Sequence, residues 1–534
     1  MKKIKWGGFF TGAAILAIAG VICRLLGVVI RIPLTNIVGN FGMGLYQMVF
    51  PLYSLLLIVS SAGVPVAISK MVAKEKTAGN TKQCHRILFN SIILLGFIGL
   101  IVSVLFMIFS VQIAKLQGNR DIWLIYLAIA PSVFLVCIIA SFRGYFQGFQ
   151  NMVPTATSQI IEQLVKVAAA LAMALVFIKI SVVWAVFGAI LAVTVSEAVA
   201  LLFLIGVYLF MRKHAPESDT PRAKHRREPK LSFKLMWDIF KQSVPVTLMA
   251  SIFPLILVMD SMLIINMLTS AGTAHEEATQ LYGISSGAVH TLINLPAVLG
   301  AAIATAVVPA VSSLLKQGKT EELREKMVLA VKVTLLISIF FAVFYLAFAD
   351  KLIDLLYHGA FKDNKSHFKL ATKLLKIESA LILLISISSV FTAMLQGANK
   401  AKFPLIALAI GGIIKIAFQL SFIRTSMGIY AVSFGNVMCF AVAAFLNTVF
   451  AFHFIKIKKT LFADITKILS VGGIFTFVAL LLQGIIPQSR WWVMLGGAIS
   501  FAIYAILVAF SGLIKFNNSN VGNILRQEQK EKYK

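Results

Sequence analysis

Two arginines lie inside the first long apolar stretch of this chain. Arg24 and Arg31 are surrounded by aliphatic residues in the segment "VICRLLGVVIRIPL", residues 21–34. An arginine at the centre of a membrane-spanning helix costs about 2.5–3.5 kcal/mol on insertion scales. The two arginines are seven residues apart, two helical turns, and therefore share one helix face with Gly20 and Gly27. This small, cationic stripe favours a water-filled cavity, in which the planar guanidinium groups could each donate two hydrogen bonds to a phosphate.

A structural role is the alternative interpretation of these arginines. Arg31 is near the expected outer end of its helix and could extend to the lipid headgroups, which would make it only an anchor. Either arginine could also pair with an acid elsewhere in the helix bundle.

Further ionisable residues occur inside other apolar runs. The candidates are Glu162, Lys166, Glu197, Asp260, His290, Glu378 and Lys415. Glu162 and Lys166 are four residues apart and could simply neutralise each other on one helix. Lys415 has Gly411 rather than an acid at that spacing, so its partner must come from another helix or be a ligand.

Two of these candidates have more than one possible role. Asp260 could provide the counter-charge to Arg24 where two halves of the protein meet. His290 could titrate near neutral pH, although a single histidine in a helix is more often a packing residue.

The composition indicates which elements must position these side chains. Hydrophobic residues make up 59% of the chain and charged residues 13%, whereas soluble domains usually contain about 25% charged residues. Apolar runs long enough to cross the bilayer as helices recur along the chain. The formal net charge is +28, but the basic residues lie in short loops and form no nucleic-acid-binding stripe. We expect an all-α, polytopic membrane protein whose partner is the lipid bilayer and not nucleic acid.

Apolar periodicity and loop signals predict about fourteen membrane spans. The predicted spans centre on residues 8–34, 45–68, 87–113, 122–146, 156–178, 182–211, 237–267, 283–312, 327–349, 374–396, 403–424, 429–455, 463–486 and 491–515. Lysine and arginine concentrate in alternate loops starting with the N-terminus, which by the positive-inside rule places both termini in the cytoplasm. The segment 350–373 is expected to be a short loop on the other side.

The spans divide into two lobes and an appendage. We predict an N-lobe over residues 1–211, a basic linker over 212–234, a C-lobe over 235–455, two additional helices over 456–515 and a cytoplasmic tail over 516–534. The two lobes repeat in sequence, because Gln147-Gly148 and Lys166 recur 249 positions later as Gln396-Gly397 and Lys415. Six helices return the chain to its starting side, so the repeats should be parallel and related by a pseudo-two-fold axis along the membrane normal.

Catalytic and nucleotide-binding motifs are missing from the sequence. It contains no G-x-x-x-x-G-K-[ST] or H-E-x-x-H pattern. We therefore expect no enzyme activity, cofactor or metal site. Transport would be driven by sodium, protons or the membrane potential.

Several stretches resemble a known family. The segments "GLYQMVFPLYSLLLIVSSAGVPVAISKMVAKE", "RGYFQGFQNMVPTATSQIIEQ" and "NLPAVLGAAIATAVVPAVS" resemble the polysaccharide-transporter branch of the MOP (multidrug/oligosaccharidyl-lipid/polysaccharide) exporters, and within it the SpoVB- and MurJ-like lipid II flippases. The resemblance covers nearly the whole chain. It implies a MATE-like fold with fourteen helices, alternating access in a bacterial plasma membrane, and an undecaprenyl-pyrophosphate-linked glycan as cargo, chiefly lipid II.

The resemblance also suggests roles for particular residues. "CRLLGVVIR" is similar to a basic first-helix pattern of the family, which implies that Arg24 and Arg31 face the cavity and hold the pyrophosphate. The spacing is one residue longer here than in many members. Where many members have a third arginine this chain has His290-Thr291, so His290, Lys166 or Lys415 would substitute. The last two helices would form a groove for the lipid tail.

Three alternatives to a lipid II flippase remain at this point. The cargo could be another lipid-linked polysaccharide unit, because such lipids share the diphosphate. A drug or cation antiporter would use acids such as Asp260, Glu162 and Glu378. A membrane glycan polymerase would need a catalytic loop, for which 350–373 offers only scattered acids and histidines.

Overall fold

The computed structural model describes residues 9–61, 63–213, 231–455, 460–487 and 489–513. Within these ranges the chain forms helices and no β-strand, which confirms the all-α prediction. The first half contains α1 (Phe9–Val29), α2 (Arg31–Ser61), α3 (Val64–Thr77), α4 (Thr81–Ile108), α5 (Ser110–Leu116), α6 (Ile122–Gly148), α7 (Val153–Phe177) and α8 (Val182–Lys213). The second half contains α9 (Phe233–Ala250), α10 (Ile252–Ser270), α11 (His275–Tyr282), a π-helix (Gly283–Val289), α12 (His290–Lys316), α13 (Thr320–Phe361), α14 (Lys365–Gly397), α15 (Lys402–Phe422), α16 (Tyr430–Ile455), α17 (Thr460–Ile485) and α18 (Trp492–Phe510).

The number of spans agrees with the prediction once one long segment is divided. Thirteen segments of the described chain are long and apolar enough to cross a membrane, and the first of them covers 63 residues, Ile15–Thr77. An unbroken helix of that length would extend about 95 Å, roughly three times the thickness of the hydrocarbon core. Gly39 interrupts it with φ 68° and ψ −176°. One span on each side of Gly39 brings the total to fourteen.

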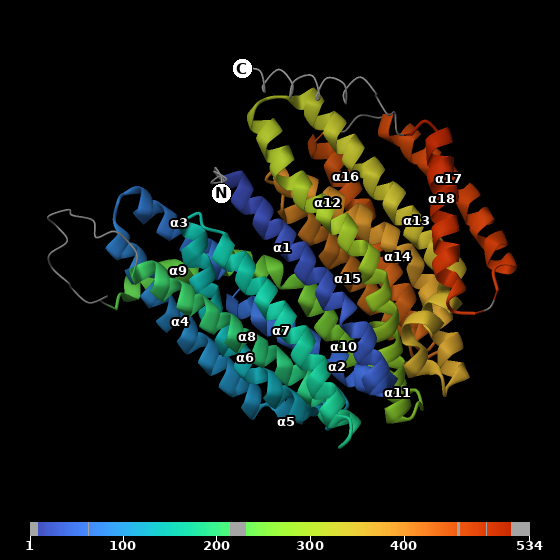
Figure 1. Cartoon of the computed structure of the whole chain (residues 1–534), viewed down its shortest axis with the longest axis horizontal. Coiled ribbons are helices and arrows are strands. Elements are labelled where there is room, and N and C mark those ends of the chain that lie inside the picture. The colour runs from blue at the N-terminus through green and yellow to red at the C-terminus, as the bar shows by residue number, and fades with distance from the viewer. Residues whose placement is uncertain (1–8, 62, 214–230, 456–459, 488, 514–534) are drawn as a thin grey trace, which may run out of the picture.

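The helices pack as two repeated lobes, here called the N-lobe (α1–α8) and the C-lobe (α10–α16) (Figure 1). In the N-lobe α4 packs against α6, α6 against α8, and α7 against α8. In the C-lobe the corresponding pairs are α13 with α14, α14 with α16, and α15 with α16. The same packing order in the same chain order is what a parallel repeat requires.

The turn that joins the fourth and fifth spans of each lobe is reproduced in detail. The helices α6 and α14 end at Gly148 and Gly397, 249 positions apart. Two residues further on, Gln150 and Asn399 have positive φ angles of 57° and 60°. The N–H of Gln150 bonds to the Gln147 carbonyl at 2.9 Å, and Asn399 makes the same bond to Gln396 at 3.0 Å. The sequence repeat therefore corresponds to one shared helix-ending motif.

This motif leads to a first prediction. Gln150→Gly is expected to stabilise the protein by about 0.5–1 kcal/mol, because glycine adopts a positive φ without the steric cost that glutamine incurs. The measurement is the thermal unfolding midpoint of the purified protein. Gln147→Gly is the matched control and should lower the midpoint, since Gln147 is inside the helix. A lower midpoint for Gln150→Gly would contradict the argument.

Several predicted span boundaries are wrong. The span predicted at 45–68 ends at Ser61, and α3 is a separate helix. The span predicted at 87–113 is α4, Thr81–Ile108, followed by the short α5. The span predicted at 283–312 begins with a π-helix. Apolar runs continue through these interruptions, so hydropathy alone does not locate them.

The predicted span 237–267 consists of two helices, α9 and α10, which are separated at Ser251. Pro254 explains the interruption, because it has no N–H to bond to the carbonyl of Ala250, four residues earlier. The helix α9, which precedes the break, lies apart from the rest of the C-lobe and packs against α3, α2 and α4 of the N-lobe (Figure 1). The N–H of Gly63 donates a hydrogen bond to Thr247 Oγ1 at 3.2 Å.

The two segments expected to be irregular are partly helical. Residues 350–373, predicted as a loop, belong almost entirely to α13 and α14, which are joined by a short turn at 362–364. Of the predicted linker 212–234, the ends belong to α8 and α9, and residues 214–230 lie outside the described part of the chain. The predicted tail, 516–534, also lies outside it.

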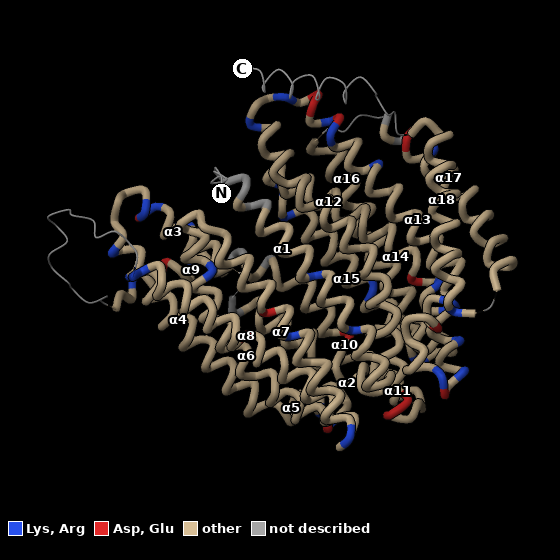
Figure 2. Tube along the Cα trace, in the orientation of Figure 1, with Lys and Arg blue, Asp and Glu red and all other residues tan. Residues whose placement is uncertain are grey.

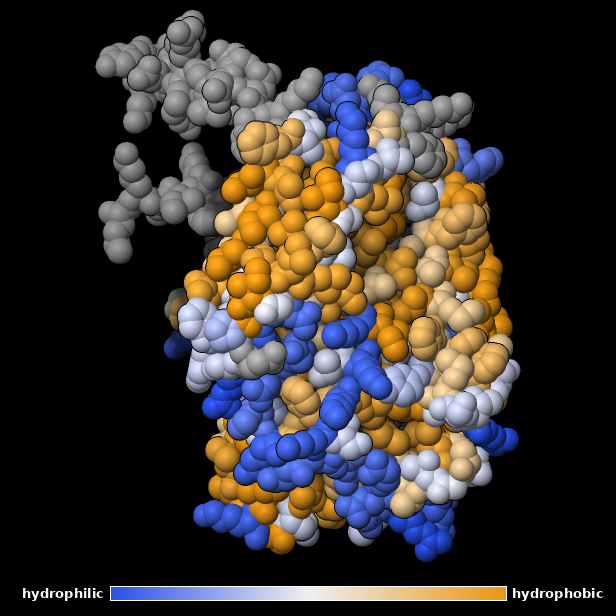
Figure 3. Space-filling model, turned by 90° about the vertical axis from the view of Figure 1, so that its right-hand side faces the viewer, coloured by the Kyte–Doolittle hydropathy of each residue, from blue (hydrophilic) through white to orange (hydrophobic). Residues whose placement is uncertain are grey.

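The helices α17 and α18 pack on α13 at the outer edge of the C-lobe (Figure 1). Tyr504 donates a hydrogen bond to the Leu336 carbonyl at 2.8 Å, and Lys332 pairs with Asp464 at 2.7 Å. Figure 3 faces the side on which these helices lie and shows a largely apolar upper part above a hydrophilic lower part. The two helices therefore add an apolar surface to the C-lobe.

Charged residues gather at the helix ends, with a small number in the middle of the lobes (Figure 2). One set of helix ends lies near residues 78–80 and 317–319; we call this the basic side because Lys74, Lys76 and Lys316 are in the adjoining last turns. The opposite side carries the bend at Gly39.

On the opposite side the two lobes are in direct contact. Asn36 donates a hydrogen bond to the Leu356 carbonyl at 2.7 Å, and Gln47 donates to the Ser286 carbonyl. Glycines bring the backbones together: a Cβ atom at Gly44 would collide with the Thr279 carbonyl. The lobes are therefore closed against each other on this side.

Candidate functional site

A polar cavity of about 240 Å³ lies between the two lobes. Its N-lobe wall is part of α2, and its C-lobe wall comes from α10, α11, the π-helix, α12, α15 and α16. The lining residues are Arg31, Gln47, Phe50, Pro51, Ser54, Phe253, Leu257, Asp260, Tyr282, Ser286, His290, Asn294, Lys415 and Asn436. We call it the interlobe cavity. Four of the candidate residues named from the sequence line it: Arg31, Asp260, His290 and Lys415.

Arg31 enters the interlobe cavity from the first residue of α2. Its guanidinium carbon lies 5.3 Å from the centre of the Phe50 ring, within the range of a cation–π contact. The salt bridges found among the described residues do not include Arg31. Its donors are therefore available to an anionic ligand.

Arg24 does not line this cavity. It is an exposed residue of α1, and like Arg31 it is absent from the ion pairs of the described chain. The helical bonds continue from α1 into α2, because the N–H of Ile30 bonds to the Leu26 carbonyl and the N–H of Leu34 to the Ile30 carbonyl, both at 3.1 Å. Gly27 faces α7, where a Cβ atom would lie 3.0 Å from Gln163 Nε2.

Lys415 pairs with Asp260, which corrects one sequence expectation. The ammonium of Lys415 on α15 donates directly to Asp260 Oδ2 on α10. Asp260 was expected as a possible partner of Arg24, but this pair occupies it. The reason is proximity, because α10 packs against α15 within the same lobe. The pair borders the cavity, with side-chain exposures of only 4% for Lys415 and 10% for Asp260.

His290 connects the interlobe cavity to Glu378, which is fully buried behind it. The distance from His290 Nδ1 to Glu378 Oε2 is 3.9 Å, too long for a hydrogen bond, and both atoms lack a hydrogen-bond partner in the described structure. The other carboxylate oxygen accepts from Ser433 Oγ at 2.7 Å and from Asn436 Nδ2 at 3.3 Å. Glu378 is therefore connected to the cavity lining by its hydrogen bond from Asn436, and it lies beside His290 without bonding to it.

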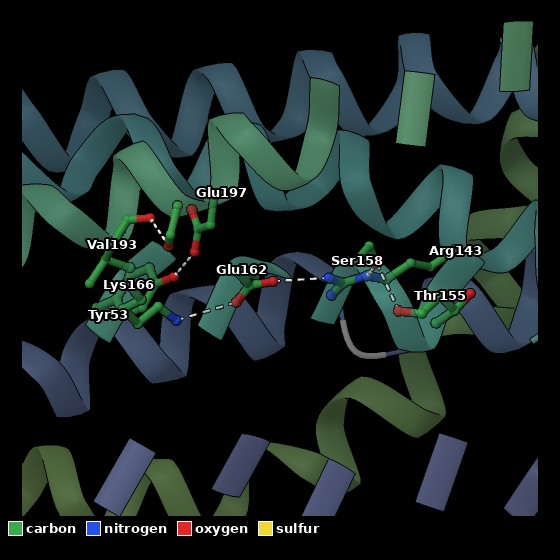
Figure 4. Close-up of polar contacts among 9 residues, drawn as sticks. Tyr53, Arg143, Thr155, Ser158, Glu162, Lys166, Val193 and Glu197 are labelled. Atoms are coloured by element: carbon green, nitrogen blue, oxygen red, sulfur yellow. Dashed lines mark hydrogen bonds and ion pairs between the residues drawn. The ribbon is translucent and has the colours of Figure 1, made fainter. Parts of the chain in front are cut away.

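Glu162 and Lys166 belong to a separate polar cluster inside the N-lobe (Figure 4). Lys166 Nζ is 3.2 Å from Glu162 Oε1, so the neutralising pair anticipated from the spacing is present. Glu162 also pairs with Arg143 at 2.9 Å. The buried Glu197 accepts a hydrogen bond from the Tyr53 hydroxyl. Glu162, Lys166 and Arg143 therefore pair with one another within the lobe.

Sequence reasoning missed the uncharged part of the site. Gln47, Asn294 and Asn436 line the cavity but were not singled out. They are polar residues inside otherwise apolar spans, and that position is the signal that could have identified them. Arg143 was also missed, although it lies inside α6 at the start of the segment "RGYFQGFQ".

The fold and this cavity define a class of protein. Two repeated six-span lobes that border a polar cavity, with two further helices at the edge, are the fold of membrane transporters of the MOP superfamily. An inward-facing multidrug resistance MATE transporter of that superfamily superimposes with a TM-score of 0.65 at 16% identity, covering 81% of this chain and 94% of the transporter. The inward closed conformation of lipid II flippase MurJ superimposes with a TM-score of 0.70 at 16% identity, covering 93% of this chain and 98% of MurJ.

The sequence comparisons are more specific. The chain belongs to the polysaccharide biosynthesis protein family, which matches residues 9–315, and residues 246–420 also match the MatE family. It is 30% identical to stage V sporulation protein B of Bacillus subtilis over 520 residues, which is 95% of this chain and 96% of that protein. It is 25% identical to lipid II flippase MurJ of the same organism over 430 residues, 77% of each chain. These relatives are consistent with transport rather than catalysis.

Proposed function

We propose that this protein is a flippase that moves an undecaprenyl-pyrophosphate-linked glycan, specifically the peptidoglycan precursor lipid II, from the inner to the outer leaflet of a bacterial plasma membrane. The observation that supports this most directly is Arg31, a cation without a carboxylate partner that borders the interlobe cavity. A pyrophosphate cannot cross hydrocarbon unaided, and a guanidinium can bind two of its oxygens at once. The similarity to the MurJ flippase suggests the same cargo.

We propose distinct roles for the two arginines. In α1 the chain runs from the basic side towards the bend at Gly39, so Arg24 is about 10 Å nearer the basic side than Arg31. A cargo that approaches from the basic side would meet the exposed Arg24 first and Arg31 afterwards. Lys415 would supply further positive charge, with Asp260 as its counter-charge in the empty cavity, and His290 would offer a hydrogen-bonding group.

The other predicted site residues have supporting roles in this proposal. Glu162 and Lys166 hold Arg143 and the N-lobe interior together, and Glu378 orients Asn436. The apolar surface of α17 and α18 would accommodate the lipid tail. The predicted boundaries of 1–211 for the N-lobe, 235–455 for the C-lobe and 456–515 for the last two helices describe the parts that would move.

Orientation and energy source complete the proposal. The positive-inside rule places the basic side, and with it both termini, in the cytoplasm. The contact between the lobes would then be on the outer side. Sodium, protons or the membrane potential would drive the cycle, because the sequence contains no nucleotide-binding motif.

The test is depletion of the protein in a strain that depends on it. We expect lipid II to accumulate on the inner leaflet, measured by mass spectrometry together with a leaflet-specific labelling assay. Accumulation of a different undecaprenyl-linked glycan would support a flippase but show that its cargo is that glycan and not lipid II. Normal distribution of all such lipids would contradict the proposal.

A drug or cation antiporter is the second candidate, favoured by the match of residues 246–420 to the MatE family. Such a protein would present a free carboxylate to an organic cation. Asp260 borders the cavity but is paired with Lys415, and Glu378 is behind His290. Drug-dependent proton or sodium flux in proteoliposomes would support this candidate.

A further inference from the structure

A second cavity of about 240 Å³ lies inside the C-lobe, between α10, α12, α14, α15 and α16. Its polar lining residues are His290, Asn294, Ser388, Thr392, Gln396 and Asn447. Lysine, arginine, aspartate and glutamate do not occur among the residues that line it. We call it the C-lobe pocket. Because its polar groups are amides, hydroxyls and one imidazole, it is built for an uncharged, hydrogen-bonding ligand.

Asn447 is the central polar group of the C-lobe pocket. Its side chain is 1% exposed, and its amide nitrogen donates to Ser388 Oγ at 3.0 Å and to Thr392 Oγ1 at 3.1 Å. Its amide oxygen has no hydrogen-bond partner among the described residues. If the amide were turned over, the nitrogen would be the unpaired atom instead. In both orientations the amide has an unused hydrogen-bonding group, and buried groups of this kind normally have partners.

The shape and walls of the pocket restrict the ligand further. A volume of 240 Å³ equals that of about eight liquid water molecules, which is enough for a single sugar ring but not for an oligosaccharide. The aromatic side chains of Phe253 and Phe440 form part of the wall. A sugar ring matches this combination, because its hydroxyls bond to amides and hydroxyls while its C–H faces pack on aromatic rings.

The C-lobe pocket adjoins the interlobe cavity. Phe253, His290 and Asn294 line both of them. A ligand that extends across this shared wall would place a charged group beside Arg31 and an uncharged group beside Asn447. A pyrophosphate linked directly to a sugar has this distribution of charge.

The N-lobe differs at the corresponding position. Thr392 lies 249 positions after Arg143, and the Arg143 side chain pairs with Glu162 and bonds to Ser158. Charged groups of the protein itself therefore satisfy each other where the C-lobe has an open polar pocket. The pocket is thus a property of one lobe and not a general result of the repeat.

We propose that the C-lobe pocket binds the sugar ring that is attached to the pyrophosphate of the cargo. This inference rests on the proposed function and specifies how the cargo is oriented in the protein. The glycan lies in the C-lobe, and the pyrophosphate lies between the lobes at Arg31.

The test compares two probes on the purified full-length protein in lipid nanodiscs. The probes are undecaprenyl pyrophosphate and the same lipid carrying an N-acetylated disaccharide. Asn447→Leu and the milder Ser388→Ala are expected to weaken binding of the sugar-bearing lipid about tenfold and about threefold, without weakening binding of the bare lipid. Ser338→Ala is the matched control, because Ser338 is a buried serine of α13 that bonds only to the Leu335 carbonyl; it should change neither affinity.

The outcomes separate the two proposals. If the wild-type protein binds the bare lipid but gains no affinity from the sugar, or if the Asn447 and Ser388 variants weaken both probes equally, the sugar site is wrong and the flippase proposal survives. If the wild-type protein binds neither probe, both proposals are wrong. Retained binding of the bare lipid by the Asn447 variant shows that the variant is folded.

Discussion

Replacing Arg31 with alanine is expected to lower the rate of glycan-lipid translocation by about 10- to 100-fold while the protein remains folded. Arg31 is absent from the ion pairs of the described chain, so its removal leaves no carboxylate stranded in the cavity. The loss is that of a charge-assisted contact to the cargo, about 1.5–3 kcal/mol, and each 1.4 kcal/mol corresponds to a factor of ten. The measurement is translocation of a fluorescent lipid II analogue by purified protein in proteoliposomes.

Two further variants make this result specific. Arg31→Lys keeps the charge but loses the planar fork, so we expect it to retain only part of the rate. Arg324→Ala removes an arginine that pairs with Glu321 near the start of α13, away from both cavities, and should leave the rate unchanged. If the Arg31→Ala variant translocates the lipid at the wild-type rate, Arg31 does not bind the cargo.

Lys415→Met is expected to destabilise the protein by about 3–5 kcal/mol. The substitution leaves Asp260 as an unpaired carboxylate in a nearly buried position, and breaking a buried ion pair from one side costs about that much. Removing both charges with Asp260→Asn and Lys415→Met together should recover most of the loss. The measurement is the free energy of unfolding of the purified protein in a double-mutant cycle.

The pair formed by Lys332 and Asp464 provides the control for that cycle. Both of its side chains are 21% exposed, so Lys332→Met should cost clearly less than Lys415→Met. If the two single substitutions cost the same, or if the double substitution of Asp260 and Lys415 is no better than the single one, the Lys415–Asp260 pair is not the buried, desolvated contact described above.

The sequence predicted the architecture well because its signals are local. Apolar length predicted fourteen spans, and the spacing of 249 between Lys166 and Lys415 predicted the repeat that the helix packing confirms. Breaks within apolar runs were missed, as at Phe109 and Ser251, because a bilayer-compatible composition continues through them.

The site was only partly predictable, for a different reason. An ionisable residue in an apolar run is conspicuous, so Arg31, Asp260, His290 and Lys415 were found. Their partners depend on which helices pack together, and the sequence of one span carries no such information. The uncharged polar residues of the cavities, such as Asn447, cost less free energy in a membrane span than charged residues do. They were therefore not singled out from the sequence.

The glycine contacts between the lobes have a consequence for movement. At Gly44 the backbone of α2 lies directly against the Thr279 carbonyl, and at Gly283 the C-lobe backbone lies against the Asn40 carbonyl. No flexible side chain at these glycines can stretch to maintain contact as the lobes separate, and dispersion attraction weakens steeply within about 1 Å. The contact between the lobes on this side can therefore be formed or broken but has little stability in between, which favours abrupt switching over gradual opening.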